Sequence, residues 1–174
     1  ASGANTILID NGSAINNNTV GGSGGGIYSI ATQSTITLDN QSTIDNNTAA
    51  NDGGGIYSIA LTSSTITVDN ASSISGNKAT AGSGGAIYNY AKDNATVEIL
   101  GDSQHEANLY TTINNNIANT HGGAIYNVSM VNANVLVGTR YNNADKKIDV
   151  RTTLSTNKAT TGSGGAIYNV AKNV

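Results

Sequence analysis

The sequence has no cysteine, no proline, no tryptophan and no phenylalanine, and only 11% of its 174 residues are charged. Without cysteine, the chain can form neither a disulfide framework nor a thiolate metal site. Its eight Lys and Arg are fewer than its eleven Asp and Glu, which gives a net charge of −3. Nucleic-acid binding needs a concentrated basic surface, so we expect no nucleic-acid partner.

Long apolar runs are also missing. No stretch approaches the roughly 20 apolar residues that a membrane-spanning helix needs, so we expect this segment not to insert into a membrane. What is present is Ile, Val, Leu, Ala and Tyr mixed with Asn, Thr, Ser and 21 glycines. This mixture favours short β-strands joined by turns.

A four-residue element, Gly-(Gly/Ala)-Ile-Tyr, occurs five times. Periods of 20 to 50 residues are typical of stacked repeat architectures. Its isoleucines lie 29, 31, 38 and 42 residues apart, at Ile27, Ile56, Ile87, Ile125 and Ile167.

Two further elements precede each copy. An apolar-x-x-Asn element lies 12 or 13 residues upstream, and a stretch with apolar residues two apart, the strand period, lies before that. We therefore predict an all-β, parallel β-helix with three strands per coil in one domain, 1–174. Its five coils should span approximately 1–31, 32–60, 61–91, 92–129 and 130–174.

In such a stack, identical residues lie above one another, about 4.8 Å apart. The asparagines should form a hydrogen-bonded corner ladder, where Asn also tolerates left-handed backbone geometry. We place the repeated isoleucines inward and the tyrosines outward, beside an outward stripe of Ile30, Ile59, Tyr90, Val128 and Val170; the reverse, with the tyrosines inward, stays open. The ladder asparagines are Asn18, Asn47, Asn77, Asn116 and Asn157, and the tyrosines are Tyr28, Tyr57, Tyr88, Tyr126 and Tyr168.

The pattern Ile74-Ser-Gly-Asn-Lys-Ala79 followed by Gly84-Gly-Ala-Ile-Tyr-Asn89 resembles the repeats of polymorphic outer-membrane proteins and related autotransporter passenger domains. The resemblance covers nearly the whole chain and implies a right-handed parallel β-helix on the bacterial surface that acts as an adhesin. The family pairs Phe-x-x-Asn with Gly-Gly-Ala, and here Ile or Leu replaces the Phe in each copy. The family's autotransporter barrel is absent from this sequence, so the resemblance does not give the mode of export.

Two insertions, residues 101–110 and 138–151, break the repeat at the same corner of consecutive coils. They hold the candidate partner-binding residues His105, Tyr110, Arg140 and Tyr141, and the second contains four of the chain's eight Lys and Arg. Irregular loops in solenoids often carry binding, so together with the five tyrosines they could bind a host-surface protein or a glycan. The alternative is a solvated loop that protects the stack.

We expect no catalytic, cofactor-binding or metal site. The acids are scattered, and Asp10, Asp39 and Asp69 each precede an Asn at a repeated turn, which explains them better than a divalent-cation site does. His121 fills a slot that other repeats fill with Ser or Asp, and we interpret it as loop surface. A carbohydrate-active β-helix enzyme, a lyase or a hydrolase, remains the alternative.

A small grid of outward threonines suggests a minor alternative, an ice-binding solenoid. The grid comprises Thr35, Thr37, Thr65 and Thr67.

The predicted function is a non-enzymatic, extracellular structural or adhesive protein of the bacterial surface. Neither end of the sequence shows a polar capping segment, which solenoids normally need. We therefore also expect head-to-tail self-association through open β-helix ends, into a filament, unless the chain is part of a longer passenger.

Overall fold

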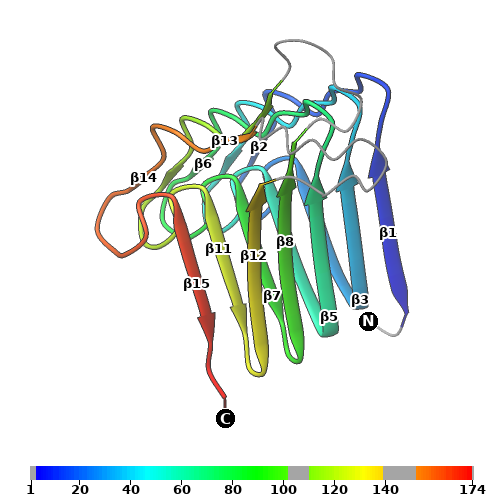
Figure 1. The fold of residues 1–174 in the computed structure, drawn as a ribbon. Coiled ribbons are helices and arrows are strands. Elements are labelled where there is room, and N and C mark those ends of the chain that lie inside the picture. The colour runs from blue at the N-terminus through cyan, green and yellow to red at the C-terminus, as the bar shows by residue number, and fades with distance from the viewer. Residues whose placement is uncertain (1–2, 102–109, 139–151, 174) are drawn as a thin grey trace.

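The computed structural model describes residues 3–101, 110–138 and 152–173, and its strands stack side by side in chain order (Figure 1). Every strand pair among these residues is parallel. The strands are β1 (Ala4–Ile9), β2 (Thr19–Val20), β3 (Ile27–Leu38), β4 (Thr48–Ala49), β5 (Ile56–Val68), β6 (Lys78–Ala79), β7 (Ile87–Ala91), β8 (Asn94–Leu100), β9 (Thr111–Thr112), β10 (Ile117–Ala118), β11 (Ile125–Ser129), β12 (Asn132–Gly138), β13 (Thr152–Thr153), β14 (Lys158–Ala159) and β15 (Ile167–Ala171).

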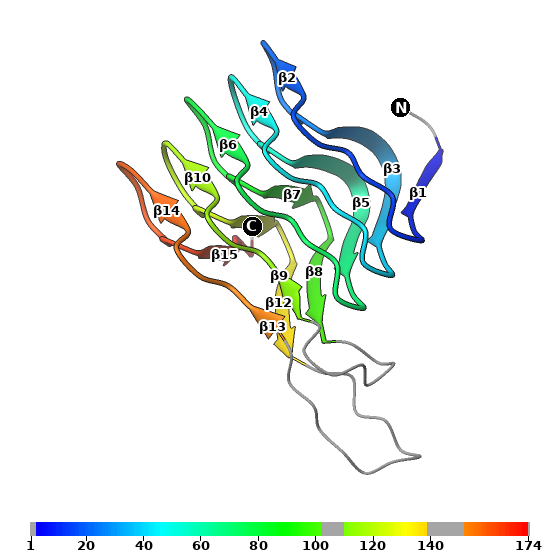
Figure 2. The ribbon, with the colours of Figure 1, turned by 90° about the horizontal axis from the view of Figure 1, so that it is seen from above.

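The strands form three sheets, and the chain visits each in turn. The largest holds β1, β3, β5, β7, β11 and β15, with β8 and β12 beside them. A second consists of the two-residue strands β2, β4, β6, β10 and β14, which line one edge of the stack in the view from above (Figure 2). The third pairs β9 with β13 and continues as isolated bridges from Ala14 to Thr112. The fold is a parallel β-helix, as the repeat spacing predicts.

The strand boundaries differ from the prediction in one respect. The Gly-Ile-Tyr strand and the alternating strand that follows it run together as β3 and as β5, and only later separate into β7 with β8 and β11 with β12. The chain nevertheless folds back between the two halves. This reversal is shown by Ser29 and Ser34, which are only five residues apart in sequence and whose hydroxyl oxygens lie 2.9 Å apart. Figure 1 shows the same reversal between β7 and β8.

The large sheet is therefore bent into two walls that meet at a narrow apex. We call the first the tyrosine wall; it comprises residues 27–31 and 56–60 with β7, β11 and β15. We call the second the threonine wall; it comprises β1, residues 33–38 and 63–68, β8 and β12. Side chains from both walls and from the third sheet's side meet in the core.

The core consists of aliphatic columns that run along the stack. Ile36, Ile44, Ile56 and Ile87 are fully buried, and equivalent residues in neighbouring coils pack against them. In the outermost described coils these columns are only partly covered, as at Ile7, Ile15, Val135, Leu154 and Ile167. Burial at each coil thus depends on a coil on either side, which is the usual arrangement in repeat proteins.

The corner asparagines form a continuous ladder. Asn77 Oδ1 accepts hydrogen bonds from the Asn47 backbone N–H at 2.9 Å and from Asn47 Nδ2 at 3.1 Å. Asn77 Nδ2 donates to the Ile44 carbonyl at 2.8 Å and to Asn116 Oδ1 at 3.1 Å. The bonds between adjacent rungs repeat from Asn18 to Asn157, so each inner amide links three coils.

The expectation of left-handed backbone at the ladder residues themselves is wrong. The left-handed residue comes one position earlier in every coil, because the turn must be completed before the amide points inward. These residues are Asn17, Asn46, Gly76, Asn115 and Thr156, with φ of 62°, 58°, 69°, 58° and 53°.

The glycines before Ile-Tyr act in two ways. Gly84 adopts a φ of 67°, which side chains rarely tolerate. Gly85 allows close approach, since a Cβ there would collide with the carbonyl oxygen of Gly123 in the next coil.

Candidate binding surface

The five repeated tyrosines form a column of stacked rings on the outside of the tyrosine wall. Parallel pairing in register places each ring above the next. From Tyr28 through Tyr57, Tyr88 and Tyr126 to Tyr168, the ring centroids are 5.2, 4.9, 4.7 and 5.1 Å apart, and the planes are inclined by 9°, 22°, 16° and 3°.

The isoleucines that precede these tyrosines point inward. Ile56, Ile87 and Ile125 are fully buried, whereas Tyr28 is 58% exposed. The reverse orientation, with the tyrosines inward, is excluded. Because each inner ring lies between two others, the column presents ring edges and phenol hydroxyls to solvent rather than ring faces.

Burial raises the pKa of Tyr57, Tyr88 and Tyr126 above the usual range of a phenol. The charge of Asp52 and the neighbouring phenols in the column raise them further. These three phenols are therefore neutral at physiological pH.

A second outward column lies two residues further along the same strands. It contains Ile30, Ile59, Tyr90, Val128 and Val170, paired in register. Ile30 is 42% exposed, but Val128 is only 2% exposed, contrary to the prediction of an exposed stripe along the full wall. Val128 pairs in register with Tyr90 and with Val170, the residues on either side of it in this column.

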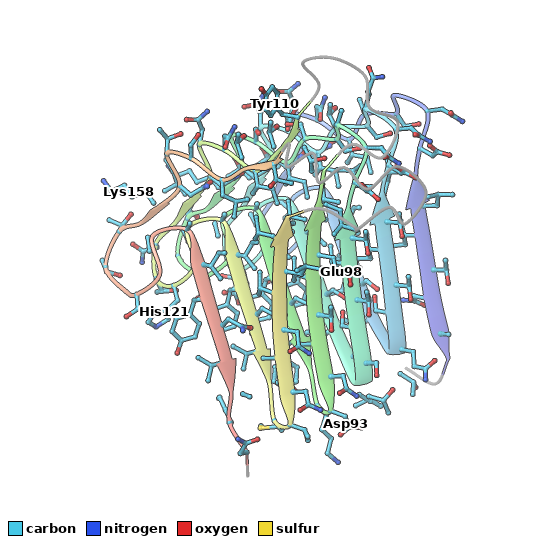
Figure 3. The ribbon with its side chains drawn as sticks, in the orientation of Figure 1. Asp93, Glu98, Tyr110, His121 and Lys158 are labelled. Atoms are coloured by element: carbon cyan, nitrogen blue, oxygen red, sulfur yellow. The ribbon has the colours of Figure 1, made fainter. Side chains whose placement is uncertain are left out.

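His121 lies partly exposed in the bend before the glycines, in line with its interpretation as loop surface, and its ring also stacks on the last ring of the tyrosine column. Its ring centroid lies 4.7 Å from that of Tyr168, and the Ser163 backbone N–H donates to its Nδ1 at 2.9 Å. The labelled side chain lies on the side of β15 in Figure 3. His121 occupies the same slot of the repeat as Asp52, whose carboxylate accepts from the Ser83 N–H at 2.7 Å. The shared slot indicates the hydrogen bond of His121 but not its ring stacking.

Of the four candidate partner-binding residues in the insertions, the structure describes one. His105, Arg140 and Tyr141 lie outside the described residues. Tyr110 is 47% exposed and lies at the top of the molecule in Figure 3, on a different side from the tyrosine wall. The flanks of the two insertions are paired, because the Gly101 N–H donates to the Gly138 carbonyl and β9 pairs with β13.

The threonine wall carries more threonine than the predicted grid. Register places Thr6, Thr35, Thr65 and Thr96 in one continuous column across four coils. Thr37 and Thr67 form a shorter second column, which Leu8 and Glu98 continue.

The aspartates at the repeated turn are engaged in hydrogen bonds. Asp39 Oδ1 accepts from the Asn40 backbone N–H at 2.8 Å and from Asn70 Nδ2 at 2.6 Å, and Asp10 makes the equivalent bonds. These bonds explain the repeated aspartates as turn residues. In the part of the chain that the structure describes, no three His, Cys, Asp or Glu side chains cluster as a metal site would require. The same part contains no helix that could cross a membrane.

Four segments of the chain match the family model of the Chlamydia polymorphic membrane protein repeat: residues 41–59, 71–90, 110–128 and 151–170. No curated protein and no solved structure matches the chain. Each matched segment contains one ladder asparagine and one tyrosine of the column, and none reaches the threonine wall. Such repeats indicate a bacterial outer-surface protein. The chain is a parallel β-helix repeat protein, and four of its segments are similar to polymorphic membrane protein repeats.

Proposed function

We propose that the chain is a non-enzymatic, extracellular adhesive element of the bacterial surface that presents its tyrosine wall to a partner. The observation that carries this proposal is the pair of outward apolar columns on that wall. Outward positions of a β-sheet that faces water are normally polar. Here Tyr28 and Ile30, in the first coil of the wall, are instead 58% and 42% exposed.

The chemistry of the wall limits the partner. The columns contain no Lys, Arg, Asp or Glu, so long-range charge attraction contributes little to recognition. Aliphatic side chains and aromatic edges offer apolar contact, and the phenol hydroxyls donate and accept hydrogen bonds. A host-surface protein or a neutral glycan would meet these groups.

The test is adhesion of beads coated with the purified chain to arrays of immobilised glycans and extracellular-matrix proteins. The double variant Ile30→Thr/Ile59→Thr should lower retention at least tenfold, because it removes apolar contact while keeping β-branched strand formers. The matched control is Thr65→Val on the threonine wall, which should retain the wild-type level. Equal retention by both variants, or none by the wild type, would count against the proposal.

Self-association is a further part of this proposal. β1 and β15 each pair on one side only among the described strands, so a further coil, from the same protein or from another molecule, would continue the sheet. Electron microscopy over a concentration series tests association between molecules. Filaments with an axial repeat near 24 Å, five coils of about 4.8 Å, would support it, and monodisperse short particles at all concentrations would oppose it.

A second candidate function, ice binding, is favoured by the four-coil threonine column. A regular array of hydroxyl and methyl groups on one flat wall can order water. Ice-recrystallisation inhibition by the wild type, lost in Thr35→Asp/Thr65→Asp, would support this candidate over adhesion.

A further inference from the structure

The tyrosine column holds phenol rings from different coils closer together than their sequence separation would suggest. The shortest ring-centroid distances are 4.7 Å between Tyr88 and Tyr126 and 4.9 Å between Tyr57 and Tyr88. The partners of the first pair are 38 residues apart in the chain. Backbone pairing in register maintains this proximity, so it does not depend on chance encounters of the rings.

We propose that the tyrosine column is a site of oxidative dityrosine cross-linking between adjacent coils. Each of two phenols gives up one electron and one proton, and the two resulting radicals join through the ring carbons ortho to the hydroxyls. The two ring hydrogens then shift to the oxygens, which restores both phenols. Hydrogen peroxide, acting through a haem peroxidase, takes up the two electrons and two protons and yields two water molecules.

Access for the oxidant comes from the outward orientation of the column. Tyr28 is 58% exposed, and the inner rings present their edges. The centroids of neighbouring rings are 4.7 to 5.2 Å apart. A radical formed on one ring can therefore pass to the next ring of the stack before two radicals couple.

The other described tyrosines lack such a partner. Tyr90 occupies the neighbouring column, where Ile59 and Val128 pair with it on either side. Tyr110 lies outside the tyrosine wall. When each ring couples only once, the five column tyrosines form at most two cross-links within one molecule.

A cross-link would staple coils that are otherwise joined only by non-covalent contacts. Joining Tyr88 to Tyr126 closes a loop of 38 residues, which limits the unfolded state as a disulfide does. We expect the melting temperature of the cross-linked fraction to rise by about 10 °C.

The experiment treats the purified full chain, at low micromolar concentration, with a haem peroxidase and hydrogen peroxide. Dityrosine fluorescence should develop in a band that still migrates as a monomer. Cleavage after Lys78, Lys92, Arg140 and Lys158 places Tyr88, Tyr126 and Tyr168 on separate peptides, whereas Tyr28 and Tyr57 stay together on 1–78. A Tyr88–Tyr126 link therefore appears as a joined pair of peptides, 79–92 with 93–140, and fragmentation identifies the coupled residues.

The decisive variant is Tyr88→Phe, with Tyr90→Phe in the same strand as its matched control. Tyr88→Phe should abolish links from coil three and leave only those of Tyr28 with Tyr57 and of Tyr126 with Tyr168, while Tyr90→Phe should leave the link pattern unchanged. The same pairs in equal yield from the urea-unfolded chain would overturn the proposal, because the fold would then have no role. Exclusively intermolecular products, or no dityrosine from the folded chain, would overturn it too.

Discussion

Two polar columns run through the inside of this β-helix, and only one of them repeats without change. The corner ladder has asparagine in all five described coils, and each inner amide is paired on both sides. The second column, inside the tyrosine wall, changes its residue type midway. It consists of Ser29, Ser58, Asn89, Asn127 and Asn169.

The change has a steric counterpart on the facing wall. Ser58 contacts Ser64 at 2.8 Å between hydroxyl oxygens, whereas Asn89 occurs where the register partner of Ser64 is Ala95. A larger inward amide is accompanied by a smaller residue opposite, which provides part of the room that the amide needs.

The junction of the two types leaves one buried acceptor unsatisfied. Asn127 Oδ1 receives Asn89 Nδ2 at 2.8 Å, but Asn89 Oδ1 has no hydrogen-bond partner in the described structure, because the preceding coil offers a serine that bonds elsewhere. A stacked ladder satisfies every amide only while the same residue recurs, and a change of residue type leaves an unpaired group at the boundary.

The largest effect should come from breaking the uniform ladder. Asn77→Leu removes the acceptor of Asn47 and three donated bonds in a fully buried position. We expect a loss of about 4 kcal/mol in the free energy of unfolding, measured by urea denaturation.

The matched control for this ladder variant is Asn94→Leu. It makes the same substitution at an exposed strand position and should change stability by less than about 0.5 kcal/mol. Similar destabilisation by both variants would show that the ladder bonds do not explain the effect.

Alkaline pH should lower the stability of the folded protein through the tyrosine column on its outer surface. Like the corner ladder, this column repeats a single residue type. Since the pKa of Tyr57, Tyr88 and Tyr126 is raised by folding, the unfolded chain releases protons from these phenols at lower pH than the folded chain does. The stabilisation is fully present below about pH 10, the ordinary phenol pKa, and is lost as pH rises above it. Thermal unfolding from pH 8 to pH 12 should show a falling midpoint, and the fall should be smaller in Tyr88→Phe.

Repairing the interrupted column should stabilise the protein. In Ser58→Asn/Ser64→Ala, the new amide can donate to Asn89 Oδ1, and the smaller residue opposite provides room, as Ala95 does in the next coil. We expect a gain of about 1 kcal/mol in urea denaturation. Ser64→Ala alone removes the contact with Ser58 and should not stabilise, and a double variant no better than this single one would refute the repair.

The smallest effect concerns a buried hydroxyl outside both columns. Ser72 Oγ is buried without a hydrogen-bond partner, so Ser72→Ala should be neutral or stabilise by up to about 1 kcal/mol. Its neighbour Ser73 donates to Asp45 at 3.0 Å, and Ser73→Ala should cost about 1 kcal/mol. Calorimetry of the two variants separates a satisfied serine from an unsatisfied one.

Much of the fold followed from the spacing of a few residues. Five copies of Gly-(Gly/Ala)-Ile-Tyr with an asparagine at fixed distance predict a parallel stack, and parallel stacking predicts columns of like residues. The inward isoleucines and outward tyrosines follow from strand alternation once one side is assigned to the core.

Other features depend on neighbours that are distant in the sequence. Strand alternation alone predicts that Val128 is exposed, yet it is only 2% exposed in the folded chain. His121 has no local signal for ring stacking, because its partner Tyr168 is 47 residues away and reaches it only through the coil repeat.

The sequence by itself determined the parallel β-helix, its repeat and the residues of each column, because identical residues at a regular period can satisfy one another only by stacking. Only the tertiary structure decided where the left-handed residues fall and that the large sheet bends into two walls with different outer surfaces. It also decided that the amide oxygen of Asn89 receives no hydrogen bond in the described structure. These features depend on how side chains from two walls and from consecutive coils fill one shared interior, and no single repeat contains that information.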